Sequence, residues 1–180
     1  MNMGSPNHEE NPVATDLYDL TVPVFLRGLR NLSAILHKGA AYAAEKGIDP
    51  LTLTQARLIA DMAPLTAQIQ YASDTAKGAM IRIGGLDPVP MADTEQSFAD
   101  LQERIEKTIA FLESVPRERI DGRDDAVVTL KTPRGDFTFT SRSHVLGFAM
   151  PNFYFHVTTA YALLRQAGVP LGKMDYLGGI

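Results

Sequence analysis

Four long stretches of the chain carry apolar residues at intervals of three and four, the spacing typical of amphipathic helices. The first helix is expected to begin near Val22, with Pro23 in its first turn, and to end at Gly47. Its apolar stripe consists of Phe25, Leu29, Leu32, Leu36, Ala40 and Ala43. This stripe predicts a helix that buries one face.

The second long helix is expected to open at Pro64 and to stop at Gly84 and Gly85. A short helix around residues 54–60 is expected before it. The apolar stripe of the second helix consists of Leu65, Ile69, Ala72, Ala76, Met80 and Ile83. A pair of glycines after such a stripe is a typical helix end, because glycine adopts the left-handed backbone that closes a helix.

The third helix follows a loop with two prolines and is expected to end before Pro116. Asp93 and Gln96 have the spacing of a capping box, in which each side chain satisfies a free backbone N–H of the helix start. The apolar stripe that follows consists of Phe98, Leu101, Ile105, Ile109 and Leu112. This helix is again expected to bury one face.

After the third helix the hydrophobic period changes from helical spacing to alternation. Val128 and Leu130, and then Phe137 and Phe139, alternate with polar residues on either side of the turn sequence 133–135. Alternation around a Pro- and Gly-containing turn predicts a β-hairpin.

The last helix is expected to be capped by Ser141 or Ser143 and to run to about Ala167. Pro151 is expected to kink or restart it, because proline lacks a backbone donor and clashes with the preceding turn. The pattern as a whole predicts an all-α fold, a four-helix bundle with a small β-hairpin inserted between helices three and four.

Residues 1–15 are polar and interrupted by proline, which is typical of a flexible N-terminal tail, and residues 16–180 are expected to form a single domain. The tail lacks the apolar segment of a signal peptide, so we expect a cytoplasmic protein. Residues 143–164 carry no acidic or basic side chain but do contain histidine, asparagine and proline. A central helix of a soluble bundle is therefore favoured over a membrane span.

Composition narrows the chemistry. The chain has no cysteine, which excludes disulfides, thiol nucleophiles and thiolate metal sites. With 17 Lys and Arg against 21 Asp and Glu, and no basic block, nothing favours nucleic acid or an anionic membrane as a partner. The sequence lacks phosphate-binding glycine loops, a GxSxG nucleophile motif and HExxH. Oxygen and imidazole chemistry is what is left.

One polar constellation interrupts the apolar face of the last helix. Asn152, His156 and Thr159 fall within about 60° of one another on a helical wheel. On the second helix, Gln68 is the polar residue expected to turn inward, and Asp74 could line the rim. These five residues are the candidate ligand-binding residues, and His156 is the candidate catalytic residue, as general base or metal ligand.

Three interpretations of this constellation stay open. His156, Asn152 and Gln68 could form a structural hydrogen-bonded network that fixes the helix register. They could instead form the floor of a pocket for an unknown small molecule. The helix could also be irregular at Pro151, so that the helical wheel misplaces the residues after it. These residues would then be scattered over the surface.

Other polar residues receive structural interpretations. His144 lies near the expected helix start, where an imidazole is typically solvated or capping. Asp74 and Lys77, three residues apart, could form a surface ion pair.

Three segments carry a resemblance to a known family: TVPVFLRGLRNLSAIL (residues 21–36), QIQYASDTAKGA (68–79) and PNFYFHVTTAYALLRQAGVPLGKMDYLG (151–178). They resemble an uncharacterised bacterial and fungal family that is grouped with the DinB/YfiT-like metalloenzymes. The resemblance implies a four-helix bundle, frequently a homodimer, with a divalent metal held by one histidine of the second helix and an HxxxH pair on the fourth. Some members resemble thiol-dependent transferases.

The metal ligands of that superfamily are only partly present. His156 matches the second histidine of the HxxxH pair, Asn152 stands in place of the first, and residues 68–74 contain no histidine. Because catalytic zinc usually takes three protein ligands, we expect no tightly bound metal and no cofactor, with weak zinc or nickel binding through His156 as the exception.

The sequence thus leads to a DinB-like bundle with a degenerate metal site and a polar pocket between its helices, serving as a small-ligand-binding or structural module. The alternative is a divalent-metal-dependent transferase or hydrolase, thiol-transferase-like, that uses His156. A third hypothesis is a homodimer whose helices mainly pack against each other.

Overall fold

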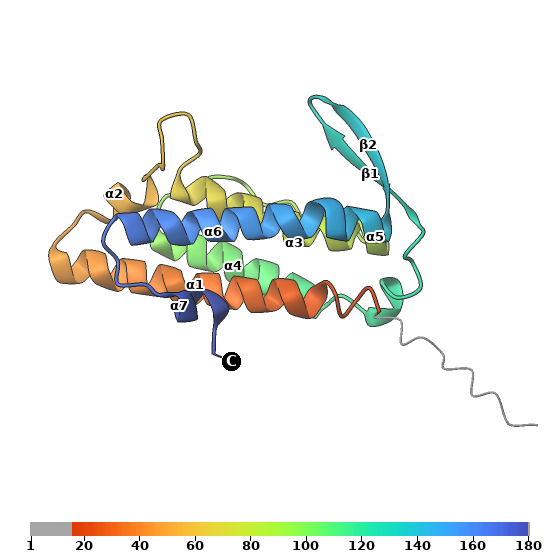
Figure 1. Ribbon diagram of the computed structural model, residues 1–180, viewed down its shortest axis with the longest axis horizontal. Coiled ribbons are helices and arrows are strands. Elements are labelled where there is room, and N and C mark those ends of the chain that lie inside the picture. The colour runs from red at the N-terminus through yellow and green to blue at the C-terminus, as the bar shows by residue number, and fades with distance from the viewer. Residues whose placement is uncertain (1–15, 180) are drawn as a thin grey trace, which may run out of the picture.

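The computed structural model describes residues 16–179, so the expected tail at residues 1–15 lies outside the described residues. Four long helices lie side by side (Figure 1): α1 (Val22–Lys46), α3 (Leu65–Gly84), α4 (Phe98–Glu113) and α6 (Met150–Gln166). This arrangement confirms the four-helix bundle that the hydrophobic spacing predicts. Within the described part of the chain, no helix combines the length and the apolar character that crossing a bilayer requires.

Helix α1 buries the face that its stripe predicts. Phe25, Leu29, Leu32 and Leu36 have no solvent exposure. The helix ends at Gly47, whose φ of 63° is the left-handed conformation that glycine adopts without steric cost. The burial of this face is what orders α1 against its neighbours.

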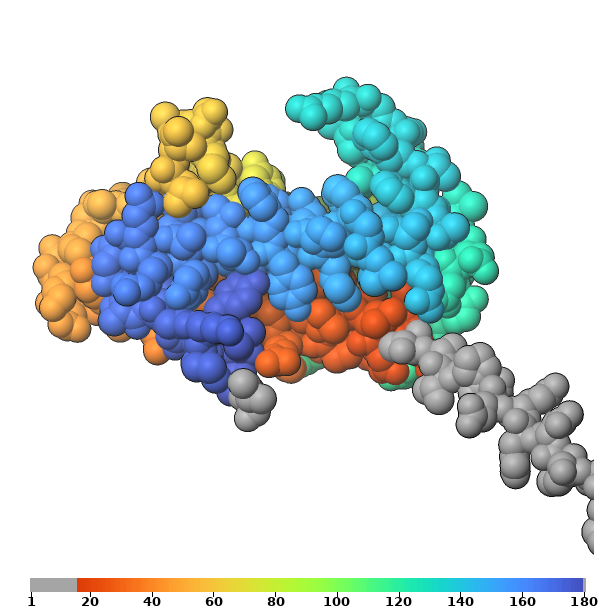
Figure 2. Space-filling view, viewed as in Figure 1, coloured from red at the N-terminus to blue at the C-terminus, as the bar shows by residue number. Residues whose placement is uncertain are grey.

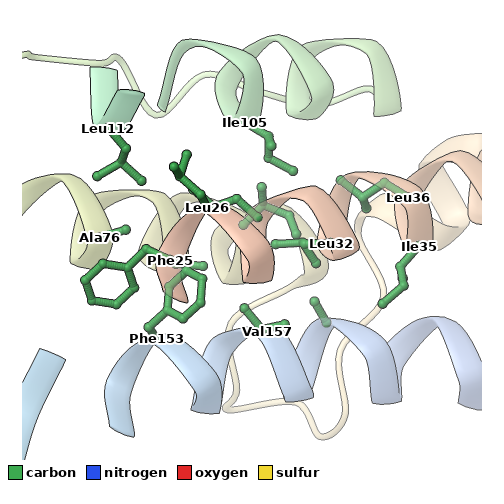
Figure 3. Close-up of a cluster of buried hydrophobic side chains, with 14 of the residues drawn as sticks. Phe25, Leu26, Leu32, Ile35, Leu36, Ala76, Ile105, Leu112, Phe153 and Val157 are labelled. Atoms are coloured by element: carbon green, nitrogen blue, oxygen red, sulfur yellow. The ribbon is translucent and has the colours of Figure 1, made fainter. Parts of the chain in front are cut away.

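The four helices enclose one hydrophobic cluster, shown in Figure 3 with side chains from each of them. Phe25 of α1 and Phe153 of α6 pack edge to face, with ring centroids 5.0 Å apart. Gly28 makes room for this contact, because a Cβ there would lie 2.5 Å from Cε1 of Phe153. The close approach fixes the middle of α6 against α1.

The short helix between α1 and α3 lies earlier than expected. It is α2 (Pro50–Thr54), and the prediction of a helix over 54–60 is wrong. Asp49 caps α2 by accepting a hydrogen bond from the backbone N–H of Leu51 at 3.0 Å, and Pro50 supplies the first-turn φ. Residues 55–64 form a loop that projects from the bundle (Figure 1).

Helix α4 begins at a different cap from the one expected. The hydroxyl of Ser97 accepts from the N–H of Asp100 at 3.1 Å, and the Asp100 carboxylate accepts from the N–H of Ser97 at 2.9 Å. This is a capping box, and the prediction that Asp93 and Gln96 form it is wrong. Asp93 instead accepts a hydrogen bond from Arg104 at 2.9 Å.

A one-turn 3₁₀ helix, η1 (Arg117–Arg119), follows α4 and leads to the predicted hairpin. Strands β1 (Val127–Thr132) and β2 (Gly135–Thr140) pair antiparallel. In this register Val128 faces Phe139 and Leu130 faces Phe137. Val128 and Leu130 are buried, so the base of the hairpin packs on the bundle while its tip rises above it (Figure 1).

The last long helix has three parts: α5 (Ser141–His144), a π-helical turn η2 (Val145–Ala149), and α6. Its N-cap is Thr140, which exchanges hydrogen bonds with Ser143, rather than either expected serine. The restart expected at Pro151 is found, because the π turn ends just before it and the proline lies in the first turn of α6.

A last short helix, α7 (Lys173–Leu177), folds back along α1. The guanidinium of Arg27 donates to the carbonyl of Leu177 at 2.8 Å, and the amide of Asn31 donates to the carbonyl of Tyr176 at 3.0 Å. These bonds satisfy carbonyl groups at the end of α7, which is too short to be stable alone.

Candidate ligand-binding cleft

A cleft of about 210 Å³ lies where α3, the last helix and the hairpin meet. It is lined by Tyr71, Asp74, Thr75, Arg82, Leu130, His144, Phe148, Asn152 and His156. Figure 2 shows that the bundle is hollowed on one face between the loop of residues 55–64 and the hairpin. The cleft therefore combines polar groups from two helices with an apolar cover from the hairpin.

The last helix contributes a row of four residues to this cleft: His144, Phe148, Asn152 and His156, each four positions after the one before. In a regular α-helix, residues four apart drift steadily around the axis. A π turn has more residues per turn and offsets this drift, and η2 lies between the first and third members of the row. The π turn thus keeps the row on one face.

Gln68 and His156 are in contact, as the sequence predicts for two inward-facing polar groups. Nδ1 of His156 lies 2.8 Å from Oε1 of Gln68, whose residue is 2% exposed. The Gln68 amide nitrogen donates to the carbonyl of Ala63 at 2.9 Å, which leaves Oε1 as an acceptor. Nδ1 of His156 must therefore carry the proton, and Nε2 is the unprotonated acceptor of the neutral ring.

The surroundings of His156 favour this neutral form. The rings of Tyr71 and Phe155 lie 5.0 and 5.2 Å from the imidazole, centroid to centroid. Burial lowers the pKa of His156 below its ordinary value, because the charged ring loses solvation there. At neutral pH the cleft thus presents an imidazole with a bare Nε2.

Asn152 lies in the cleft but bonds elsewhere than His156. Its amide nitrogen donates to the hydroxyl of Thr75 at 2.7 Å, and that hydroxyl donates to the carbonyl of Tyr71 at 2.6 Å. This chain of hydrogen bonds ties α6 to α3 one turn away from the imidazole. The structure therefore brings Gln68, Asn152 and His156 to one region, in two separate sets of hydrogen bonds.

Thr159 does not line this cleft. Its hydroxyl donates to the carbonyl of Phe155, one turn back in the same helix, at 2.8 Å. A threonine that bonds its own helix in this way is satisfied without a ligand. It borders a separate, mostly apolar hollow formed with Tyr154, Phe155 and the 55–64 loop.

Asp74 is at the rim of the cleft, but its carboxylate is already paired. Oδ1 lies 2.9 Å from the guanidinium of Arg104 and 3.1 Å from the ammonium of Lys77. The expected pair with Lys77 is present, although the Lys77 side chain is buried, at 8% exposure, rather than on the surface. The Asp74 carboxylate is thus paired with two cations, and no hydrogen bond or ion pair joins it to His156 among the described residues.

Sequence reasoning missed Arg104, which is 2% exposed and organises an acidic cluster. Its guanidinium donates to Asp74, Asp93 and Glu95, each at 2.9 Å. Burial alone would raise the pKa of Glu95, but hydrogen bonds from Arg104 and Gln70 lower it overall.

The sequence contains a sign that Arg104 is buried, because this residue lies on the apolar stripe of α4, between Leu101 and Ile105. A larger hollow of about 690 Å³ borders this cluster, where the guanidinium is neutralised by carboxylates.

His144 is also misplaced by the sequence analysis. The ring is fully buried instead of solvated, and neither ring nitrogen has a hydrogen-bond partner within residues 16–179. It packs between the rings of Phe139 and Phe148, with centroids 5.6 and 5.8 Å away. Burial, with the charge of Arg82, lowers the pKa of His144 to about 4. A neutral imidazole with two unmet hydrogen-bonding atoms therefore lies at the hairpin end of the cleft.

The cleft offers few metal ligands. Across the described part of the chain, no group of three or more His, Asp or Glu side chains is placed to hold a metal ion. His156 is hydrogen-bonded to the amide of Gln68, and the amide of Asn152, one turn earlier in the helix, is bonded to Thr75. One imidazole with two amides does not match the three-ligand pattern of catalytic zinc.

Comparison with known proteins places the chain in a family. A crystal structure of a DinB family member from Shewanella denitrificans is similar over 91% of this chain and 93% of its own, with 38% sequence identity and a TM-score of 0.84. No curated protein matches the chain. The family model described as a domain of unknown function, DUF1993, matches residues 17–177. The DinB-like resemblance read from the sequence is thereby confirmed, and the chain belongs to the DUF1993 family.

Proposed function

We propose that this bundle is a small-molecule-binding domain whose ligand occupies the cleft between α3 and α6. The ligand donates a hydrogen bond to Nε2 of His156 and packs its apolar part against the aromatic residues of the cleft. Binding needs no resident metal. A concave, largely apolar site with a few fixed polar groups is the usual form of a small-ligand site.

The observation that carries this proposal is the fixed tautomer of His156. The carbonyl of Ala63 orients the Gln68 amide, and the amide oxygen in turn holds the proton on Nδ1. Two linked hydrogen bonds thus prepare a bare acceptor on Nε2, which has no partner among residues 16–179. An acceptor that faces a cleft is open to the donor of a ligand, and the two hydrogen bonds on the far side of the ring leave it free to bind.

The residues present do not fit the metal chemistry of the wider superfamily. Among the described residues, Asp74 is the carboxylate that lines the cleft, and Arg104 and Lys77 are both paired with it. Moving it to His156 would leave the buried Lys77 ammonium without its carboxylate partner, and breaking a buried pair typically costs about 3 to 5 kcal/mol. The proposal therefore gives His156 the role of hydrogen-bond acceptor and derives no step through a metal.

Phenol is a direct probe of this acceptor, because it carries one O–H donor on a flat apolar ring. Nitrogen NMR of the full chain at pH 7 should show His156 protonated on Nδ1, and phenol should shift the Nε2 resonance. Anisole, which lacks the donor, should leave that resonance in place. His156→Gln should remove phenol binding.

His37→Gln is the matched control, because His37 lies exposed on α1 and outside the cleft. This variant should bind phenol as the unmodified chain does. Protonation on Nε2, or phenol and anisole acting alike on His156, would overturn the proposal.

A further inference from the structure

Two groups at the hairpin end of the cleft have hydrogen-bonding capacity that no residue in the described range uses. His144 is fully buried with both ring nitrogens unpartnered. Arg82 of α3 lines the same cleft and forms no ion pair or side-chain hydrogen bond there. Every other buried side-chain nitrogen or oxygen described has a partner, except Thr54 Oγ1 and Arg104 Nε. His144 is thus the one described residue with two buried side-chain atoms that lack a partner, and it faces the cleft that Arg82 also lines.

The backbone of α3 makes room for the Arg82 guanidinium. A Cβ at Gly78, one turn earlier, would lie 2.8 Å from Nη1 of Arg82. The missing side chain lets the guanidinium fold back along α3, the direction in which Thr75 and Tyr71 continue the cleft wall. The charge is near enough to His144 to help keep that ring neutral.

Apolar side chains complete this end of the cleft. Leu130 of the hairpin and Phe148 of the π turn line it, and Phe139 packs on the His144 ring at 5.6 Å. No acidic side chain other than Asp74 lines the cleft, and Asp74 is paired with Arg104 and Lys77. The site is thus an exposed cation at the mouth of the cleft and a buried imidazole behind it, with the apolar side chains of Leu130 and Phe148 lining the cleft.

We propose that the hairpin end of the cleft binds the carboxylate of a small organic acid between Arg82 and His144. The carboxylate accepts hydrogen bonds from the guanidinium and from one N–H of the imidazole. A short aromatic or aliphatic body lies between Leu130 and Phe148. The inference deepens the proposed function and rests on it, since it names the ligand class for the same cleft.

Carboxylate is the anion that this geometry suits. A planar guanidinium binds a carboxylate through two parallel hydrogen bonds, and such charge-assisted bonds are about twice as strong as neutral ones. The cleft volume of about 210 Å³ admits only a small molecule. Because both ring nitrogens of His144 are shielded from solvent, the acid reaches them when the hairpin moves outward, and it holds the hairpin closed once bound.

Benzoate is the probe, with benzyl alcohol as an uncharged analogue of similar shape. Titration of the full chain, followed by NMR of the histidine side chains, should shift His144 with benzoate and leave it unchanged with benzyl alcohol. Arg82→Gln and His144→Leu should each weaken benzoate binding about tenfold or more, the loss typical of one charge-assisted hydrogen bond. Hydrogen exchange in residues 127–140 should slow when benzoate binds.

Arg165→Gln is the matched control, because Arg165 is exposed in the last turn of α6 and lies outside the cleft. It should bind benzoate as the unmodified chain does. Urea unfolding of His144→Leu shows whether that variant is folded, and Arg82→Gln tests the site independently of it.

The outcomes separate the two proposals. Phenol binding at His156 without benzoate binding would overturn the carboxylate site and leave the proposed function standing. Benzoate binding that is equally tight in Arg82→Gln would overturn the assignment of the carboxylate to Arg82. Failure of both probes would overturn both proposals.

Discussion

Oε1 of Gln68 lies 2.8 Å from Nδ1 of His156, joining α3 to α6 through their side chains. The contact couples a buried amide, that of a residue 2% exposed, to a half-buried imidazole. Because Ala63 fixes the amide from the other side, the protonation pattern of the ring follows from backbone geometry. This contact gives the cleft a defined hydrogen-bond acceptor at Nε2. A charge introduced at position 68 should therefore change the pKa of His156 directly.

Replacement of Gln68 by glutamate should raise the pKa of His156. An ionised carboxylate at hydrogen-bond distance favours the imidazolium, and a partly buried position strengthens the effect. We expect the pKa to rise by about 1 to 3 pH units, the range typical of an adjacent opposite charge. A proton NMR titration of the His156 ring measures it.

Gln68→Met is the neutral control for this prediction. It removes the acceptor but leaves the burial that lowers the pKa of His156, so the pKa should stay below its ordinary value. An unchanged His156 pKa in Gln68→Glu would show that the two side chains do not meet in solution.

The buried His144 should make the protein lose stability in mild acid. Burial lowers its folded-state pKa to about 4, against 6.5 in the unfolded chain. The unfolded chain therefore takes up a proton first, and stability that is complete above pH 6.5 declines as the pH falls toward 4. Between pH 7 and pH 5 this should cost about 2 kcal/mol, measured as the change in unfolding free energy in urea.

His144→Leu isolates that contribution, because it removes the titrating ring and keeps an apolar side chain. The difference in stability between pH 7 and pH 5 should shrink by about 2 kcal/mol in this variant. His37→Gln, at the surface of α1, should keep the full difference. An equal acid sensitivity in the unmodified chain and His144→Leu would contradict the assignment.

The fold could be predicted from the sequence because burial dominates it. The apolar stripes of α1, α3 and α4 point to the core, and alternation marks the hairpin. The residue that caps each helix is harder to predict, because several neighbouring residues have side chains that can form the cap. Asp93 had capping spacing, but a buried guanidinium competes for its carboxylate, and Ser97 forms the cap instead. Which residue caps α4 therefore depends on Arg104, a residue inside the helix that binds the Asp93 carboxylate.

The site could be predicted only in part, for a related reason. The helical wheel brings Gln68 and His156 together, because regular geometry holds where each of them lies. It fails for His144, since that ring is buried by Phe139 of the hairpin and aligned by a π turn, neither of which a wheel contains. Arg104 was overlooked because a charge on an apolar stripe becomes meaningful only when its carboxylates are in place.

Removal of the Arg104 side chain should be strongly destabilising. Arg104→Met leaves Asp74, Asp93 and Glu95 without their common partner, and Glu95 has a side chain only 11% exposed. Breaking a buried ionic cluster from one side typically costs 3 to 5 kcal/mol, so we expect a loss of about 3 kcal/mol in urea unfolding. Hydrogen exchange should rise in residues 86–97, which the guanidinium holds to α3 and α4.

Two variants bracket this prediction. Arg104→Lys should recover only part of the stability, because an ammonium cannot bind several carboxylates in the geometry of a guanidinium. Lys107→Gln, one turn further along α4, breaks an exposed pair with Glu103 and should cost less than about 0.5 kcal/mol. Equal effects of Arg104→Met and Lys107→Gln would mean that the cluster contributes nothing.

Introducing histidines at the two positions where the metalloenzyme resemblance implies them should convert the cleft into a zinc site. Asn152 lies one turn before His156 in the same row, and Gln68 touches the His156 ring. The double variant Gln68→His, Asn152→His therefore offers three imidazoles at one place, the number that catalytic zinc usually takes. Competition with a chromophoric chelator should show zinc binding about 100-fold tighter than in the unmodified chain, since even lost supporting groups cost 10- to 100-fold.

The metal content of the purified protein decides between ligand binding and metal-dependent catalysis in the unmodified chain. Protein purified without a histidine tag should contain zinc or nickel well below one equivalent, because His156 is the sole matching ligand. The double variant carrying His156→Ala should lose the gain, which ties the metal to the cleft. Stoichiometric metal in the unmodified chain that disappears in His156→Ala would instead support the metal-dependent transferase or hydrolase and reject binding without a resident metal.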